Sequence, residues 1–237
     1  MITLALDSSD SRGSIAVRRD AQTVALRLHE GSTDYSSWLL GATEDALREA
    51  SATMGSVGLL AVSTGPGSFT GVRIGLTAVK AWADVYGRPV VGVSRLQAMA
   101  RVGERSGIVA ASYDAQRGQI FAGLYRWVEG VANAVESDMV ISAEGFVAFV
   151  EEHAGGSSVR WVTLDPQLIA SAPSWSTREQ RGDRIIACPA DVASLIGELA
   201  EERAKHGQFT DPLELDANYV RRSDAEIFWK GPASGER

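Results

Sequence analysis

The first half of the chain opens with a hydrophobic period of two and then changes to a period near 3.6. Alternating apolar residues predict three short strands, over about residues 2–7, 13–17 and 23–28. The later apolar runs predict helices over about 36–50 and 72–86 and strands over about 59–62 and 90–93. Three consecutive strands followed by alternating helices and strands favour an α/β fold with a mixed sheet, antiparallel at first and parallel afterwards.

The second half begins again with strands. Apolar runs predict strands over about 107–113, 119–127, 160–164 and 184–187 and helices over 143–152 and 189–205, the last with Pro189 at its start. Between the halves, Ser94-Arg95-Leu96-Gln97 has the form of a capping box and predicts a short linking helix. We therefore expect an N-terminal domain over 1–100 and a C-terminal domain over 101–230, whose last segment can pack back on the first. The small, polar tail at 231–237 is expected to be disordered.

Composition and charge narrow the class of protein. No apolar run approaches the roughly 18 residues that span a bilayer, and the N-terminus lacks the basic region of a signal peptide, so we expect a cytoplasmic protein. Cys188 is the single cysteine, which excludes an intrachain disulfide. The net charge of −7, with basic runs no longer than the pairs Arg18-Arg19 and Arg221-Arg222, argues against unaided RNA binding.

The glycine-rich stretch at residues 65–71 is the most informative motif. It joins a predicted buried strand to a predicted helix, whose N-terminal N–H groups suit an anion. Gly65, Gly67 and Ser68 are therefore candidates for a phosphate or nucleotide loop, although no Gly-Lys-Ser/Thr follows. The alternative is a tight turn that the packing alone requires, and on physical grounds this alternative is favoured.

A second candidate is the loop Asp7-Ser8-Ser9, where an acidic residue at a strand end precedes two hydroxyl side chains. Such a loop can hold a hydrated metal ion and a phosphate, but Asp and Ser are equally typical of a hairpin turn. An actin-like nucleotide site would also need a second phosphate loop, for which Asp114 followed by Gly118 is the candidate in this sequence.

The predicted helix over 72–86 carries more apolar surface than packing on one face requires. Its polar residues fall on one narrow stripe, and a wide apolar arc of this kind is typical of a partner interface or of a helix buried inside the protein. We expect the partner interface to include residues of both N-terminal helices, namely Trp38, Leu39, Val72, Arg73, Leu76, Val79 and Lys80.

Catalytic and metal-binding patterns are weak. His29, His153 and His206 are far apart in the sequence, and none stands three or four residues from another, so no helical metal motif is available. The sequence also lacks a Gly-x-Ser-x-Gly nucleophile elbow. We therefore assign no catalytic residue and no metal ligand, and we interpret Cys188 as a small buried side chain.

The motifs together resemble the TsaB family, also called YeaZ. The resemblance rests mainly on residues 64–76, Thr-Gly-Pro-Gly-Ser-Phe-Thr-Gly-Val-Arg-Ile-Gly-Leu, with support from 2–17, 89–99, 114–121 and 218–221. Residues 130–210 match only loosely. The family's first helix commonly opens with His-Ser, where this chain has Tyr35-Ser36, and Gly41 stands where proline is usual.

This resemblance implies an actin-like (ASKHA, ribonuclease H-like) fold with two βββαβα-type domains. It implies a non-catalytic subunit that activates a TsaD-type catalytic subunit, which makes N6-threonylcarbamoyladenosine at position 37 of tRNAs reading ANN codons. A TsaE-type ATPase would join at the junction, a homodimer would form when the chain is alone, and tRNA would be reached only through the complex. No intrinsic cofactor is expected, any ATP or ADP being bound at the junction. The alternatives are an ATPase-like nucleotide-binding enzyme or a glycoprotease-type peptidase acting alone.

Overall fold

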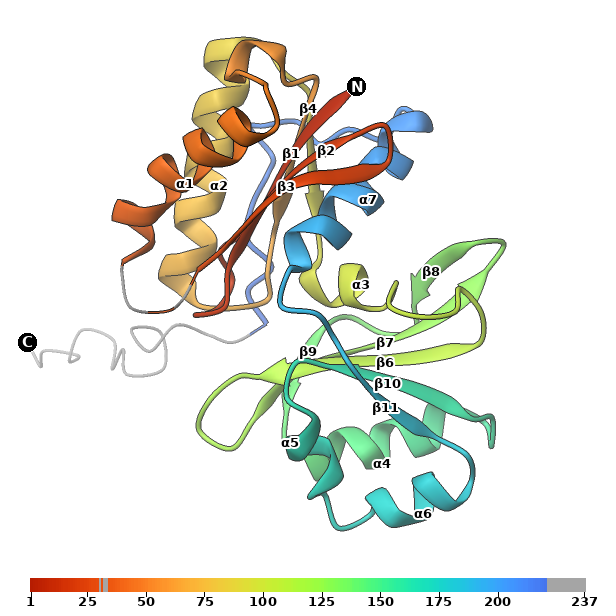
Figure 1. The fold of residues 1–237 in the computed structure, drawn as a ribbon. Helices are drawn as coiled ribbons and strands as arrows, with labels where there is room; N and C mark the ends of the chain where they lie inside the picture. The colour runs from red at the N-terminus through yellow and green to blue at the C-terminus, as the bar shows by residue number, and fades with distance from the viewer. Residues whose placement is uncertain (30, 32–33, 221–237) are drawn as a thin grey trace, which may run out of the picture.

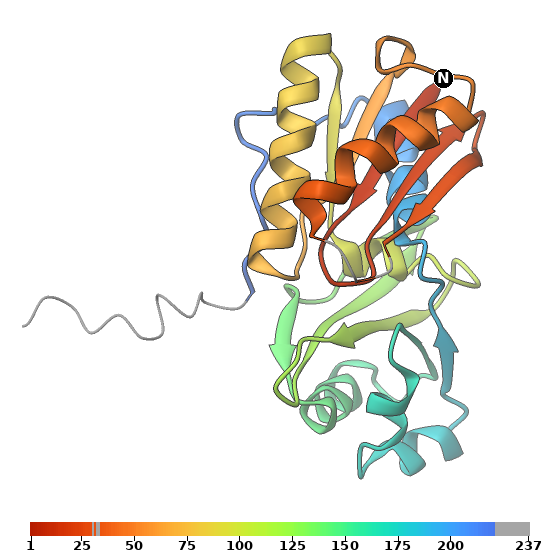
Figure 2. The same ribbon diagram turned by 60° about the vertical axis from the view of Figure 1, so that its left-hand side comes forward.

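The computed structural model describes residues 1–29, 31 and 34–220. The basic pair Arg221-Arg222 and the tail at 231–237 lie outside these residues. The described part forms two mixed sheets, one above the other, with helices on their outer faces and a contact layer between them (Figures 1 and 2). No helix among the described residues is long and apolar enough to cross a membrane.

The first sheet has the order β3-β2-β1-β4-β5. Its strands are β1 (Ile2–Asp7), β2 (Ser14–Arg19), β3 (Gln22–Leu28), β4 (Leu59–Ser63) and β5 (Val90–Val93). Neighbours β1, β2 and β3 pair antiparallel, whereas β4 pairs parallel with both β1 and β5. Two long helices, α1 (Tyr35–Glu49) and α2 (Phe69–Tyr86), cover one face, and the short 3-10 helix η1 (Met54–Ser56) leads into β4 (Figure 1).

The second sheet repeats this topology. Its strands are β6 (Ile108–Asp114), β7 (Ile120–Val128), β8 (Val131–Ala134), β10 (Val159–Thr163) and β11 (Arg184–Ala187), with β9 (Met139–Ile141) paired to β7. Read from β8 to β11, the order β8-β7-β6-β10-β11 matches that of the first sheet, and the antiparallel and parallel pairings fall at the same places. Helices α4 (Ala143–His153), α5 (Pro166–Ala170) and α6 (Trp175–Gln180) cover the outer face (Figure 1). The structure thus contains a duplication that the sequence does not reveal.

The two inner faces are covered crosswise: the helix that follows the last strand of one sheet lies against the other sheet. Helix α3 (Arg95–Met99), which follows the last strand of the first sheet, contacts β6 and β7 of the second. Helix α7 (Val192–Lys205), which follows the last strand of the second sheet, lies against β1, β2, β4 and β5 of the first. Thr210 then bridges to Val90, so the chain after α7 stays beside the first sheet.

The apolar core falls into three clusters that follow these layers. One lies between the first sheet and helices α1 and α2, and another lies between the second sheet and helices α4 to α6. The third lies between the two sheets and contains buried residues of α3 and α7, such as Leu96, Met99 and Ile196. Because this cluster draws on both halves of the chain, the halves share one interior.

The predicted elements are present, with shifted ends and several additions. Helix α2 begins at Phe69 rather than near 72, because the Ser68 side chain caps it by accepting a hydrogen bond from the Gly71 N–H. Helix α7 begins at Val192, so Pro189 precedes it, and Ser14 Oγ accepts the hydrogen bond of the Ala193 N–H at 3.0 Å. The short elements β8, β9, η1, α5 and α6 were not predicted.

The linking helix α3 forms where the capping box predicts it, but the box is only half made. Ser94 Oγ accepts a hydrogen bond from the Gln97 N–H at 3.4 Å, as expected. Gln97 Oε1, which would accept the Ser94 N–H in a full capping box, accepts instead from Arg203 Nη2 of α7 at 2.7 Å. Gln97 Nε2 donates to the Ala132 carbonyl at 2.9 Å, which ties this helix to β8.

Candidate functional site between the two sheets

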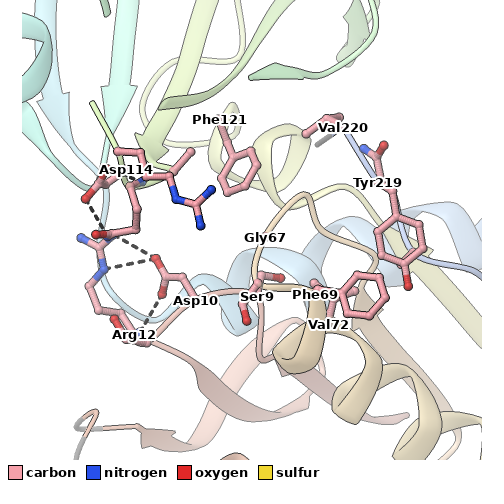
Figure 3. A pocket seen from close by; sticks show the side chains of 17 residues that line it. Ser9, Asp10, Arg12, Gly67, Phe69, Val72, Asp114, Phe121, Tyr219 and Val220 are labelled. Atoms are coloured by element: carbon pink, nitrogen blue, oxygen red, sulfur yellow. Dashed lines mark hydrogen bonds and ion pairs between the residues drawn. The ribbon is translucent and has the colours of Figure 1, made fainter. Parts of the chain in front are cut away.

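A cavity of about 560 Å³ opens between the two sheets. One wall comes from the loop after β1 and the start of α2, and the other comes from the turn after β6 and the C-terminal segment (Figure 3). The lining residues are Ser9, Asp10, Ser11, Arg12, Gly67, Ser68, Phe69, Val72, Asp114, Ala115, Gln116, Arg117, Phe121, Ala217, Asn218, Tyr219 and Val220.

The residues expected to form a phosphate loop divide into two groups. Those that line the cavity are Ser9, Gly67 and Ser68. Those that are buried outside its lining are Asp7, Ser8 and Gly65. Asp114, the candidate for the second loop, also lines the cavity, whereas Gly118 does not. The two turns therefore meet at one cleft, as an actin-like arrangement requires.

The loop after β1 packs directly on the beginning of α2. The Ser68 N–H donates to the Ser9 carbonyl at 2.6 Å, and the hydroxyl groups of Ser9 and Ser63 are 2.7 Å apart. The Ser8 hydroxyl donates to the Gly71 carbonyl at 2.8 Å. Polar groups that could have faced a phosphate are therefore bonded within the protein.

Two glycines of the motif are explained by this close approach. A Cβ atom on Gly67 would overlap the Ser9 carbonyl oxygen and lie 2.8 Å from the Ser9 Cβ, and one on Gly71 would overlap the Ser8 carbonyl oxygen. Only glycine permits backbone contacts of this kind. At these two positions the structure agrees with the packing alternative considered from the sequence.

The Asp7 side chain is neutralised inside the protein. Its Oδ2 accepts a hydrogen bond from Arg95 Nε at 2.8 Å, and its Oδ1 accepts the Ser9 N–H at 3.1 Å. Both side chains of this ion pair are completely buried. The guanidinium carbon of Arg95 also lies 4.3 Å from the centre of the Tyr113 ring, at cation–π distance. Asp7 is thus a buried anion whose charge is balanced by Arg95.

A second group of charges joins the two halves across the cleft. Arg12 Nη1 donates to Asp165 Oδ1 at 2.7 Å, and Arg12 Nη2 donates to Asp10 Oδ2 at 2.9 Å. Asp165 also accepts the Asp114 N–H at 2.7 Å. Asp114 lines the other wall of the cavity (Figure 3). Arg95 Nη1 and Asp10 Oδ2 form an ion pair at 2.9 Å. The orientation of the two groups does not meet hydrogen-bond geometry. Burial alone would raise the pKa of Asp10, but Arg95 and Arg12 outweigh it and lower that pKa to about 2.

An aromatic cluster forms the outer rim of the cavity. The rings of Phe69 and Tyr219 are 5.2 Å apart (Figure 3). The Arg73 guanidinium lies 3.7 Å from the centre of the Phe69 ring. Arg73 Nε donates to the Tyr219 hydroxyl at 2.7 Å. These contacts hold the C-terminal segment against the first turn of α2.

Asp138 fastens the C-terminal segment to the second sheet. Its carboxylate accepts hydrogen bonds from Tyr125 at 2.7 Å, Ser94 at 2.7 Å and Asn218 at 2.8 Å. Burial raises the pKa of Asp138, although all three hydrogen bonds act in the opposite direction. The neighbouring residues Asn218 and Tyr219 thus contact opposite sides of the cleft.

The residues of the cleft do not fit the metal and phosphate chemistry of an actin-like ATPase. The carboxylate at the end of β1 is paired to Arg95, and the Ser68 N–H at the start of α2 is bonded to the Ser9 carbonyl. Within the described ranges, no three His, Cys, Asp or Glu side chains are arranged to hold a metal ion. Burial raises the pKa of the Cys188 thiol to about 12, so this nearby group is protonated at neutral pH.

The partner interface expected from the sequence requires a correction. Four of its apolar side chains are buried in the core beneath α1 and α2, with exposed fractions of 5% or less; they are Leu39, Val72, Leu76 and Val79. They were misassigned because the sequence shows that α2 is apolar on most sides but not which side faces the sheet. Arg73 is exposed and Lys80 is partly exposed, and Trp38 is half-buried against His29.

The surface of the two helices carries a different apolar row. On α2 it consists of Ile74, Ala78, Ala81 and Val85, which are half-buried or exposed and follow helical spacing. Trp38 contacts His29 at the end of β3, and two residues turn a helix by about 200°, so Leu40 lies on the opposite flank of α1. Val85 is 72% exposed and Leu40 is 58% exposed.

Several residues of the cleft were missed from the sequence. Asp10 and Arg12 were assigned no role from the sequence, and Asp165 lies in the loosely matching region. Arg95 was seen as part of a capping box and not as the partner of Asp7, which is 88 residues away. Only the topology brings these residues together. An arginine at the start of a helix, where an anion is usually preferred, was the one available signal.

Two mixed sheets of identical strand order around a central cleft define an actin-like α/β fold. Residues 29–159 match the family model described as TsaD: tRNA N6-adenosine threonylcarbamoyltransferase. The tRNA threonylcarbamoyladenosine biosynthesis protein TsaB of Escherichia coli is 30% identical over 168 residues, which are 69% of this chain and 71% of that protein. The chain belongs to the TsaB (YeaZ) family.

Two further relatives extend the similarity over almost the entire chain. The protein of the same name from Bacillus subtilis is 26% identical over 236 residues, covering 97% of this chain and 98% of that protein. YeaZ from Pseudomonas aeruginosa superimposes with a TM-score of 0.72 and 25% identity, covering 92% of this chain and 99% of that one.

Proposed function

We propose that this chain is a non-catalytic subunit of the machinery that makes N6-threonylcarbamoyladenosine in tRNA. It binds a TsaD-type catalytic subunit and stabilises the competent conformation of that subunit, a population shift driven by differential binding. The family membership supports the pathway, and the surface of α1 and α2 supports the partner role. An ATPase subunit of the TsaE type, with any nucleotide at the junction, completes the proposed complex.

The observation that carries the partner role is the exposed apolar row on α2, together with Leu40 on α1. Aliphatic side chains as exposed as Val85 and Leu40, next to half-buried Ile74 and Trp82, form a surface that another protein can cover. An actin-like partner would present equivalent helices to it. A second copy of this chain could bind the same row when the partner is missing.

The chemistry of the cleft supports a non-catalytic role. Asp7 and Asp10 are held by Arg95 and Arg12, so neither is poised to bind a metal ion or accept a proton. The three histidines lie in separate places: His29 stacks on Tyr35, His153 stacks on Phe149, and His206 follows α7. This distribution favours a binding subunit over a peptidase or an independent ATPase.

The deciding experiment is threonylcarbamoylation of tRNA in vitro, with the cognate TsaD and TsaE subunits and threonylcarbamoyl-adenylate supplied, with and without this chain. We expect product only in its presence. Equal product without the chain would remove the partner role and direct attention to the cleft.

Variants of the exposed row locate the contact. Val85→Glu and Leu40→Glu should each weaken binding to the catalytic subunit at least tenfold, since each buries a charge in an apolar interface. Leu213→Glu is the matched control, because Leu213 is 90% exposed but lies in the C-terminal segment. Equal affinity of all three variants and the wild type, measured by calorimetry, would place the interface elsewhere.

A further inference from the structure

A second cavity of about 460 Å³ lies on the second sheet, away from the central cleft. It is bounded by the loop at 103–107, by the start of β10 and by the turn before β11. None of its lining residues contributes to the central cleft or to helices α1 and α2. It therefore belongs to neither site discussed above.

Two arginines stand side by side in this cavity. Arg160 of β10 and Arg184 of β11 are partners in the parallel register, so their side chains leave the same face of the sheet from adjacent strands. Like charges placed directly opposite each other destabilise a sheet. Within the described part of the chain, neither arginine makes a salt bridge.

Asp183, the residue before Arg184, already has several partners. Asp183 accepts the Val159 N–H with one oxygen, and the Trp161 and Arg178 side chains with the other, at 2.7 to 2.8 Å. These bonds lie on the opposite, helix-covered side of the sheet, where Trp161 is fully buried. The charge of Asp183 is therefore already balanced by its buried ion pair with Arg178 rather than by Arg184.

Arg160 keeps unused hydrogen-bonding capacity. It donates from Nη2 to the Glu104 carbonyl and from Nη1 to the Ser106 carbonyl at 3.5 Å, which tethers the loop over the cavity. Its Nε is buried without a partner among the described residues. Burial lowers the pKa of this guanidinium, opposed by Glu104, so an anion placed beside it would be stabilising.

We propose that this cavity binds a small phosphate monoester, with Arg160 and Arg184 holding the phosphate and the remaining volume holding the organic group. A phosphate monoester carries about two negative charges at neutral pH, which matches two guanidinium groups better than a single carboxylate does. The hydroxyl groups of Ser106 and Ser158 add donors, and Ile186 adds an apolar wall.

An RNA backbone is a poorer occupant than a small molecule. Binding to RNA needs a broad basic surface, whereas this chain has a net charge of −7 and Glu104 stands at the edge of the cavity. A protein of this charge repels anions at long range, so any phosphate it binds must be held by a specific site. The inference is independent of the proposed partner role.

The test is titration of the full chain with glycerol 3-phosphate, glycerol and acetate, followed through the arginine Nε–H signals in NMR. We expect saturable binding of glycerol 3-phosphate alone, with a shift of the Arg160 signal. Arg184→Gln should weaken binding at least about tenfold, because a charged hydrogen-bond partner is lost. Arg184 is exposed, so the variant should fold.

Arg126→Gln is the matched control, because it removes one positive charge from an exposed position of the same sheet outside the cavity. Its affinity should equal that of the wild type. Equal weakening by both variants, or equal binding of acetate and glycerol 3-phosphate, would show non-specific charge attraction and overturn the proposal. Binding of an RNA oligonucleotide but not of glycerol 3-phosphate would overturn it as well.

Discussion

Asp7 and Arg95 form an ion pair of 2.8 Å at the centre of the molecule, and neither side chain has any exposed surface. Asp7 ends the first strand of the first sheet, and Arg95 opens the helix that leads to the second. The pair therefore fixes the position of the linking helix relative to the cleft. Removing one partner would leave the other charge buried and uncompensated.

Replacing one member of this pair should cost stability rather than catalysis. We expect Asp7→Ala to lower the free energy of unfolding by about 3 to 5 kcal/mol, measured by denaturant titration. The folded fraction of the variant should still support threonylcarbamoylation in the reconstituted complex. A stable variant that has lost activity by several orders of magnitude would instead make Asp7 a catalytic group.

The double variant Asp7→Ala/Arg95→Met provides the control for that experiment. Because it removes both charges together, it should be less destabilised than the sum of the two single variants. Exact additivity would show that the two side chains act independently.

The glycine motif should be sensitive to a single methyl group. Gly67→Ala should destabilise the fold by roughly 2 kcal/mol, because its Cβ would overlap the Ser9 carbonyl oxygen. Gly41→Ala is the matched comparison, since Gly41 lies inside α1 with no atom within 4 Å of the added Cβ. That change should stabilise the chain by about 0.5 to 1 kcal/mol. Similar thermal shifts for both variants would contradict the packing explanation.

The charges across the cleft should make stability fall in acid. The pKa of Asp10 is lowered from 3.8 to about 2 in the folded state, so its stabilising effect is complete above pH 4 and is lost as the pH falls toward 2. This shift corresponds to roughly 2 kcal/mol. Compared with Asp10→Asn, the wild type should lose that much extra stability between pH 5 and pH 2. Parallel stability curves for the two proteins would refute the assignment.

Two valines of α2 should respond differently to the same substitution. Val79 has no exposed surface, so Val79→Asp buries an unpaired charge and should prevent folding. Val85 is 72% exposed, and Val85→Asp should change the free energy of unfolding by no more than about 0.5 kcal/mol. Circular dichroism of the purified variants checks this difference. A well-folded Val79→Asp variant would mean that α2 is rotated from the orientation described.

The isolated chain should not bind nucleotide at the central cleft. Titration with Mg-ATP, monitored by calorimetry, should give no saturable signal, because Asp7 is paired with Arg95 and the Ser68 N–H is bonded to Ser9. Saturable binding that is abolished by a bulky substitution at Ser68 would restore the nucleotide-binding alternative.

The sequence predicted the order of elements well because most strands and helices carry a strong hydrophobic period. Short elements carry little periodic signal, and β8, β9, α5 and α6, with three to six residues each, were missed. Strands β5 and β11 have only four residues each, but their consecutive valine or isoleucine residues were recognised as apolar runs. The repeated topology was expected only from the family resemblance, which implies two βββαβα-type domains, because strand order is determined by pairing between distant residues. The crosswise placement of α3 and α7 follows from the same long-range contacts.

The candidate site was predicted only in part. The Asp7 loop and the glycine loop could be recognised in the sequence as parts of one cleft, because both follow strands that are neighbours in an actin-like sheet. It could not show that Arg95 neutralises Asp7, since the two are joined only by the folded topology. Helix α2 is apolar on most sides, so the sequence could not show which side faces the core. Buried residues of this helix were therefore assigned to the surface.

The crosswise exchange of α3 and α7 means that neither half of the chain is a complete folding unit. A cut in the connection before β6 would leave the first sheet without α7 and the second sheet without α3, each exposing an apolar inner face. Such fragments would be insoluble when expressed separately and would complement each other when expressed together. The two halves of repeated topology therefore depend on each other for folding within one polypeptide.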